Sequence, residues 1–116
     1  MTEIAEPLAK FHARLDVSGR VTIPRHIRSV FRIHQNDYIK ATIRRVNVDL
    51  GLKVIYVSGE ERNIIMRVGR AGMITIPREI REKLQLESGD LVELILLNVF
   101  KLKTGCEREF KYVWEE

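Results

Sequence analysis

The residues in this sequence best suited to chemistry are arginines, and several recur at the same spacing in both halves of the chain. Arg14, Arg25 and Arg28 each have an arginine 53 residues later, at positions 67, 78 and 81. A guanidinium can bind a phosphate through two parallel hydrogen bonds or contact a guanine edge in the major groove. One exposed arginine is typical of any protein surface, but a repeated set favours an anionic partner.

The charge distribution also favours an anionic partner, and it places that partner on the first half. The formal net charge is +4. Residues 1–58 hold ten Lys and Arg against five Asp and Glu, whereas residues 59–116 hold ten against eleven. An electrostatically guided partner should therefore meet the first half preferentially.

Other reactive residues lack the spacing that catalysis or metal binding requires. His12, His26 and His34 are not spaced as ligands of one metal ion, and the lone Cys106 excludes an internal disulfide or a multi-cysteine site. Neither a glycine-rich phosphate loop nor a catalytic Ser–His–Asp order is present. We therefore expect a protein that is not an enzyme and that uses no cofactor.

An internal repeat organises the chain. Residues 14–43 align without a gap to residues 67–96, and nine of the thirty pairs are identical, where average composition gives roughly two. This pattern indicates a duplication. We divide the chain into an N-terminal extension (1–10), a first copy (11–58) and a second copy (63–116), with a polar linker at 58–61. Units near 50 residues are marginal alone, so the copies should share one core.

The first copy predicts a ββαββ unit. Alternation over residues 11–17 predicts a strand with one buried face, and residues 21–23 predict a second. Pro24 suits the first turn of a short helix, whose Ile27, Val30 and Phe31 should form the apolar stripe. Strands over 38–48 and 52–57 should follow, around a turn at 49–51.

The second copy predicts the same order of elements. Strands are expected over 64–68, 73–76 and 90–103, with a helix over 77–86 and a last strand over 109–114 after a turn at 104–105. Phe110, Tyr112 and Trp114 should face the core of that last strand. Asn36 and Gly89 occupy equivalent positions and both tolerate a left-handed backbone, so both copies should use the same turn. The expected fold is mostly β with short helices.

One segment carries a family resemblance. Residues 15–25, LDVSGRVTIPR, resemble the core of the AbrB/SpoVT DNA-binding domain, in which a Gly-Arg strand runs into Ile-Pro and a short helix. The second copy matches through GMITIPR at 72–78, and the two matches extend over roughly residues 11–57 and 64–114. The resemblance implies a swapped-hairpin, AbrB-like β-barrel, in which two ββαββ units interleave. The two copies of one chain could form this barrel as a pseudo-dimer, or two chains could form a swapped homodimer.

The resemblance also implies a site, because basic residues on the first strands, the next loop and the short helix of this family meet DNA. The predicted DNA-binding residues are Arg14, Arg20, Arg25, His26, Arg28, Arg67, Arg70, Arg78 and Arg81. Among them, Arg70 is included as a basic neighbour of the matching positions. The second copy departs from the pattern, because Met73 replaces Arg20 and three acidic residues (Glu79, Glu82, Glu87) replace His26, Ser29 and His34. We therefore expect it to contribute less to DNA binding.

Three functions fit this interpretation. The first is a transcriptional regulator or architectural protein that binds double-stranded DNA. The second is the antitoxin of a toxin–antitoxin pair, for which a toxin protein would be a further partner. The third is an interaction module that does not bind DNA. With no apolar run near the ~20 residues of a membrane span and no signal peptide, we expect a cytoplasmic, nucleoid-associated protein.

Overall fold

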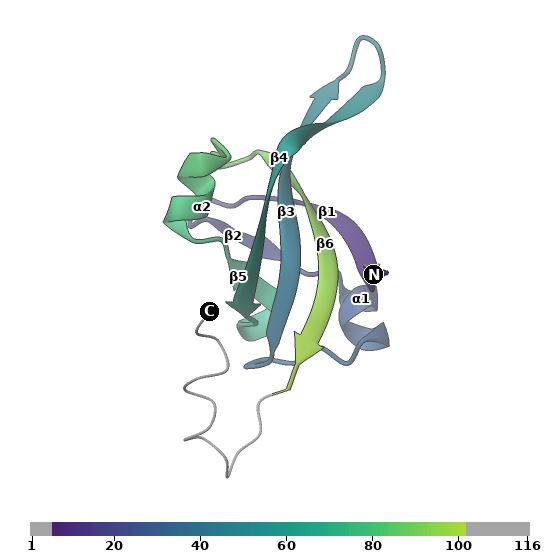
Figure 1. The fold of residues 1–116 in the computed structure, drawn as a ribbon, viewed down its shortest axis with the longest axis vertical. Coiled ribbons are helices and arrows are strands. Elements are labelled where there is room, and N and C mark those ends of the chain that lie inside the picture. The colour runs from purple at the N-terminus through teal and green to yellow at the C-terminus, as the bar shows by residue number, and fades with distance from the viewer. Residues whose placement is uncertain (1–5, 102–116) are drawn as a thin grey trace, which may run out of the picture.

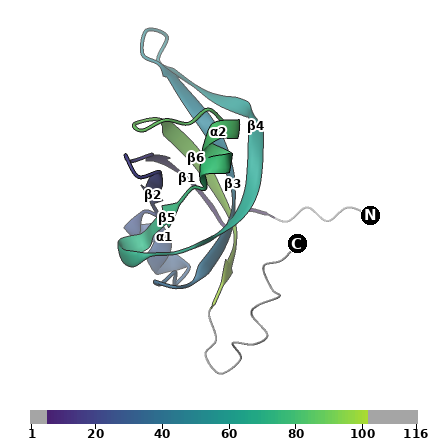
Figure 2. The same cartoon turned by 90° about the vertical axis from the view of Figure 1, so that its left-hand side faces the viewer.

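The computed structural model describes residues 6–101 and has a mostly β fold, as the sequence predicts. Its main sheet is antiparallel, with the strand order β1-β6-β3-β4. The strands of this sheet are β1 (Ala9–Arg14), β3 (Tyr38–Asp49), β4 (Val54–Arg67) and β6 (Leu91–Phe100). A two-stranded antiparallel ribbon is formed by β2 (Arg20–Thr22) and β5 (Met73–Thr75). The sheet curls into a half-barrel, and the ribbon lies across its open side (Figures 1 and 2).

Three short helices connect these strands. They are α1 (Arg25–Val30), the 3-10 turn η1 (Arg70–Gly72) and α2 (Arg78–Lys83). Pro24 and Pro77 precede α1 and α2 with nearly identical backbone angles (φ −56°, ψ 144° and 146°). Proline suits the start of a helix for two reasons. Its fixed φ matches the helical backbone, and a residue at this position needs no N–H donor.

The core is aliphatic and draws on both predicted copies. Its largest fully buried side chains come from both sheets and from residues that directly follow β2, β4 and β5: Val21, Ile23, Ile39, Ile43, Val68, Ile74, Ile76, Val92, Leu94 and Leu96. Buried residues from both segments therefore belong to one hydrophobic cluster.

Strand pairing repeats itself about a pseudo-two-fold axis. Arg14 pairs with Leu91 and Tyr38 pairs with Arg67, so an offset of 53 residues exchanges the two pairs. Val21 lies opposite Ile74, which is its own counterpart at this offset, and the axis therefore passes through the centre of the ribbon.

The turn after each helix is the one that the sequence predicts. Asn36 and Gly89 have positive φ values of 77° and 91°. In both turns an aspartate follows, Asp37 or Asp90, whose carboxylate accepts a backbone N–H three residues earlier at 2.8 Å. The side chain thus fixes the turn that begins β3 or β6.

Several predicted details are wrong. Residues 58–61 belong to β4 rather than to a linker, because β4 continues past a bulge opposite Arg45 and pairs again with β3 at Val57 and Val46. Val17 is 88% exposed because β1 ends at Arg14, and Val30 is 70% exposed at the end of a six-residue helix. The turn at 104–105, Cys106 and the strand at 109–114 lie outside the described residues.

Candidate nucleic-acid interface

The ribbon of β2 and β5 presents a polar outer side over a buried inner side. Val21 and Ile74 are each 1% exposed and point into the core. The residues that flank them must point outward, because side chains alternate along a strand. Arg20 lies opposite Thr75, and Thr22 lies opposite Met73. One end of the ribbon therefore carries Arg20. The position 53 residues later, at the other end of the ribbon, carries Met73 instead of an arginine.

Asp16 shapes the turn that presents Arg20. Its Oδ1 accepts the backbone N–H groups of Ser18 at 2.8 Å and Arg20 at 2.9 Å. Its Oδ2 accepts the Nε–H of Arg20 at 3.2 Å, while the Arg20 side chain stays 42% exposed. The backbone N–H of Arg20, helped by that of Ser18 and by the guanidinium, lowers the pKa of Asp16 despite some desolvation.

Arg14 and Arg67 hold related positions at the ends of β1 and β4. Arg14 Nη1 donates to the carbonyl oxygen of Gly89 at 2.9 Å, and Arg67 Nη2 donates to Oδ1 of Asn36. Both arginines are exposed. A guanidinium carries five N–H donors, so each side chain is oriented by the neighbouring left-handed turn and still has donors for a phosphate.

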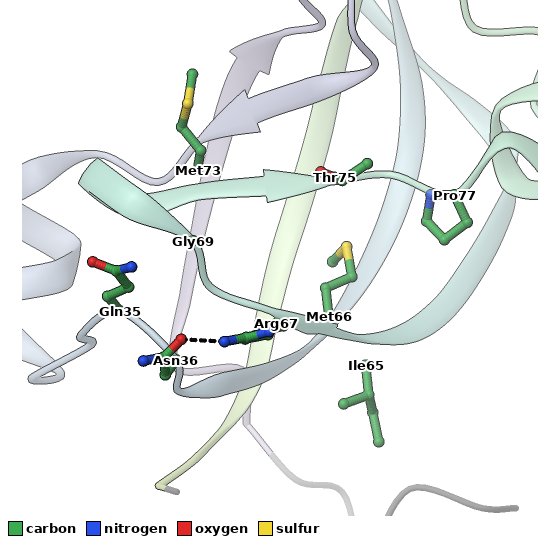
Figure 3. A pocket seen from close by; sticks show the side chains of 9 residues that line it. All are labelled: Gln35, Asn36, Ile65, Met66, Arg67, Gly69, Met73, Thr75 and Pro77. Carbon is green, nitrogen blue, oxygen red and sulfur yellow. Dashed lines mark hydrogen bonds between the residues drawn. The ribbon is translucent and has the colours of Figure 1, made fainter.

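Two adjoining hollows bring some of these arginines together. A cavity of about 540 Å³ lies between β4, β5 and the turn at 35–36, and Arg67 in its lining points toward Asn36 (Figure 3). A second cavity of about 350 Å³ is bordered by Arg20 and Arg70. The two share lining residues on β5 and before η1, which are Gly69, Met73 and Thr75. We call these two hollows, which share the wall formed by Gly69, Met73 and Thr75, the groove; Arg67 lines the first, and Arg20 and Arg70 line the second.

Arg28 and Arg81 lie inside the fold more than the resemblance implies. Each is partly buried and donates its Nε–H to a backbone carbonyl, Arg28 to Ile23 and Arg81 to Ile76, both at 3.0 Å. Arg28 crosses over Gly72 of the other copy, where a Cβ atom would stand 2.4 Å from the Cδ of Arg28.

Arg81 covers Gly19 in the same way, with a closest distance of 2.7 Å to its Cζ, and both glycines have a φ of +78°. The pairs therefore lock each helix to the loop of the other copy. Identity of Gly19 with Gly72 and of Arg28 with Arg81 was the sequence signal for this contact, but only the fold shows which glycine each arginine covers.

The remaining predicted residues lie on exposed surface. Arg25 and His26 are exposed on α1, and Arg70 is exposed on η1. Arg78 on α2 is exposed as well, with its Nε 3.2 Å from Glu82. Positive charge on α2 is thus partly balanced by its own carboxylates.

The outer face of the main sheet offers a contrast, because its cations lie beside carboxylates. Glu93 on β6 has a 4% exposed side chain, and its carboxylate lies 3.2 Å from His12 on β1 and 3.9 Å from Arg44 on β3. Arg44 lies 3.0 Å from Glu61 on β4. This row of alternating charge is a less suitable surface for a polyanion than the groove beside the ribbon.

Comparison with known proteins identifies relatives of part of the chain and of its fold. Residues 65–98 match the family model described as "Antidote-toxin recognition MazE, bacterial antitoxin". The solution structure of PHS018 from Pyrococcus horikoshii is similar to 85% of this chain and 99% of its own, at 29% identity and a TM-score of 0.69. No curated protein sequence matches.

These findings support the expected family in part. None of the helices within residues 6–101 has the length and apolar composition needed to cross a membrane. A family of antitoxins is non-enzymatic, in agreement with the sequence analysis. From the end of β4 through most of β6 the chain is similar to a MazE antitoxin domain, and its fold is similar to that of PHS018.

Proposed function

We propose that this protein binds duplex DNA through the groove beside the β2–β5 ribbon, and that it is the antitoxin of a toxin–antitoxin pair. The match of residues 65–98 to a MazE domain carries this proposal. The matched segment supplies Arg67, Arg70 and Met73 to the groove. The AbrB/SpoVT resemblance implies DNA contact by a set of basic residues that includes Arg20, Arg67 and Arg70 of the groove.

The family match also bears on the choice between regulator and antitoxin. It favours the antitoxin, because the matching description is one of toxin recognition. Under this proposal the protein has two partners, double-stranded DNA and a toxin protein, and acts in the cytoplasm. A regulator without a toxin remains the second candidate, since the groove serves both roles equally.

The proposed interface consists of two unequal halves about the pseudo-two-fold axis. Arg20 stands on one side, while its counterpart Met73 stands on the other. Arg14 and Arg67 are matched, and so are Arg25 and Arg78, but Glu82 lies against Arg78. We assign Arg28 and Arg81 mainly to the fold, because their Nε donors are already used.

Fluorescence anisotropy on a labelled duplex tests DNA binding. We expect Arg20→Ala to weaken binding about tenfold or more, as loss of a phosphate or base contact does. Neutralisation of about six phosphates would make log K fall with log salt at a slope near −5. Lys10→Gln is the control, because Lys10 is 63% exposed and lies beside Glu93 on the face of the main sheet away from the groove. Equal losses for both variants would contradict a localised site, and no binding in dilute buffer would contradict the function.

Growth assays test the antitoxin role. Co-expression of this protein with its cognate toxin should relieve growth arrest, and the two should elute together in size-exclusion chromatography. DNA binding without any such toxin would favour the regulator.

A further inference from the structure

The hairpin of β3 and β4 extends beyond the barrel as an arm. β6 begins at Leu91, which pairs with Val46, so after Val46 no strand within residues 6–101 pairs with that side of β3. From there the two strands pair only with each other, as Asn47 with Tyr56 and Asp49 with Val54. We call residues 47–57 the hairpin arm, which projects from the body in both views (Figures 1 and 2).

Most of the large apolar side chains exposed within residues 6–101 lie on this arm. Of ten such residues, seven belong to it: Val48, Leu50, Leu52, Val54, Ile55, Tyr56 and Val57. Their exposed fractions run from 37% at Val57 to 83% at Leu50. Monomeric proteins rarely leave so much contiguous apolar surface in water unless it has a partner.

The pairing arranges part of this surface as a continuous strip. Val48 lies opposite Ile55, and Val46 lies opposite Val57. Side chains of directly paired residues share one side of a hairpin, so these four form an aliphatic strip. Its inner end, Val46, is 4% exposed, and the strip therefore continues outward from a packed region.

The arm has a defined shape. Asp49 Oδ1 accepts the backbone N–H of Leu52 at 3.0 Å and closes the tip, and Lys53 takes a left-handed backbone with φ of 58°. A fixed tip reduces the entropy that an arm loses when it binds.

We propose that the hairpin arm is a self-association surface, on which the arm of a second copy of this chain packs. Its only charges are Asp49 and Lys53, so two arms meet without net repulsion, and a polyanion gains nothing there. Seven large apolar residues of one arm are each between 37% and 83% exposed, and packing against a second arm would remove these side chains from water. The outer edges of both strands of the arm form no pairing with another strand of residues 6–101, so a second arm can approach in a two-fold symmetric dimer. This proposal does not depend on DNA binding.

Sedimentation equilibrium over a range of concentrations tests the proposal. The wild-type chain should reach twice its 13.5 kDa mass. Ile55→Lys and Leu52→Lys should each raise the dimer dissociation constant at least tenfold, because each places two charges in a two-fold apolar interface. Val30→Lys is the matched control, because Val30 is 70% exposed on α1, and its dissociation constant should stay within twofold of the wild type.

Three results would overturn the proposal. A wild-type chain that stays monomeric up to several hundred micromolar would show that the arm does not self-associate and that its partner is a different protein. A dimer that persists unchanged in both arm variants would be held elsewhere, as a hairpin-swapped dimer would be. Equal weakening by Val30→Lys would make the effect one of charge alone. Circular dichroism melts show that the variants fold, and if one does not, the other carries the test.

Discussion

Replacement of Gly72 by alanine should destabilise the protein by an amount that depends on Arg28. Gly72 has a φ of +78°, and an alanine in this left-handed region costs about 1–2 kcal/mol. The new Cβ would also stand 2.4 Å from the Cδ of Arg28. Arg28 would have to move and release the carbonyl of Ile23, a hydrogen bond whose loss costs about 1 kcal/mol. The sum is about 2–3 kcal/mol, or a fall in Tm of roughly 10 °C for a chain of this size.

A double-mutant cycle in urea separates the two contributions. In an Arg28→Ala background, Gly72→Ala should lose only the backbone cost, which gives a coupling of about 1 kcal/mol. Gly89→Ala is the control for backbone cost, because Gly89 has a φ of +91° and nothing within 4 Å of its Cβ position. Gly59→Ala should change little, since no atom lies near and its φ is ordinary. Additive effects, or a Gly72→Ala cost no larger than that of Gly89→Ala, would refute the contact between the two copies.

Three further predictions concern the turn at Asp16 and the ribbon. Asp16→Asn should keep both backbone hydrogen bonds yet release Arg20, so DNA binding should tighten and its salt slope steepen by about one; weaker binding in anisotropy would contradict this. Met73→Arg should tighten binding several-fold, because it places an arginine at the position related to Arg20; an unchanged affinity would count against the groove. Since the folded-state pKa of Asp16 is lowered, its stabilising contribution is present above pH 3.8 and is lost as pH falls through the lower folded value. The amide NMR signals of Ser18 and Arg20 should therefore titrate below pH 3.8, and a midpoint above it would argue against these bonds.

Much of the local structure could be predicted from residue types. Pro24 and Pro77 mark helix starts, and Asn36 and Gly89 mark left-handed turns, because each residue has a backbone preference that acts locally. Alternation identified Phe11 and Leu15 as core residues for the same reason. Such signals need no knowledge of distant parts of the chain.

The errors arose where long-range pairing overrides local pattern. Residues 58–61 are polar and contain Gly59, which is typical of a linker, yet pairing with β3 on both sides of a bulge holds them in β4. Val17 continues the alternation of β1, but the Asp16 carboxylate closes a turn over residues 16–20 that contains Val17. Exposure of the arm likewise depends on the register by which the start of β6 pairs with Val46 of β3, and no local pattern encodes that register.

The candidate site was predictable as a set of arginines but not as a geometry. Arg20, Arg67 and Arg70 border one groove only because β5 pairs with β2 beside the end of β4. Arg28 and Arg81 had the same sequence signature as the others, yet the fold uses them to cover Gly72 and Gly19. A repeated arginine can therefore reflect repeated packing as well as a repeated binding contact.

The most direct test of the DNA-binding proposal is an NMR titration of the isotopically labelled protein with a short duplex at low salt. We expect the amide signals of residues 14–20 and 67–75 to shift, while those of the hairpin arm and of the row around Glu93 stay in place. Shifts confined to the arm or to that row, or no shift at all, would contradict the assignment of the arginine-bordered groove to DNA.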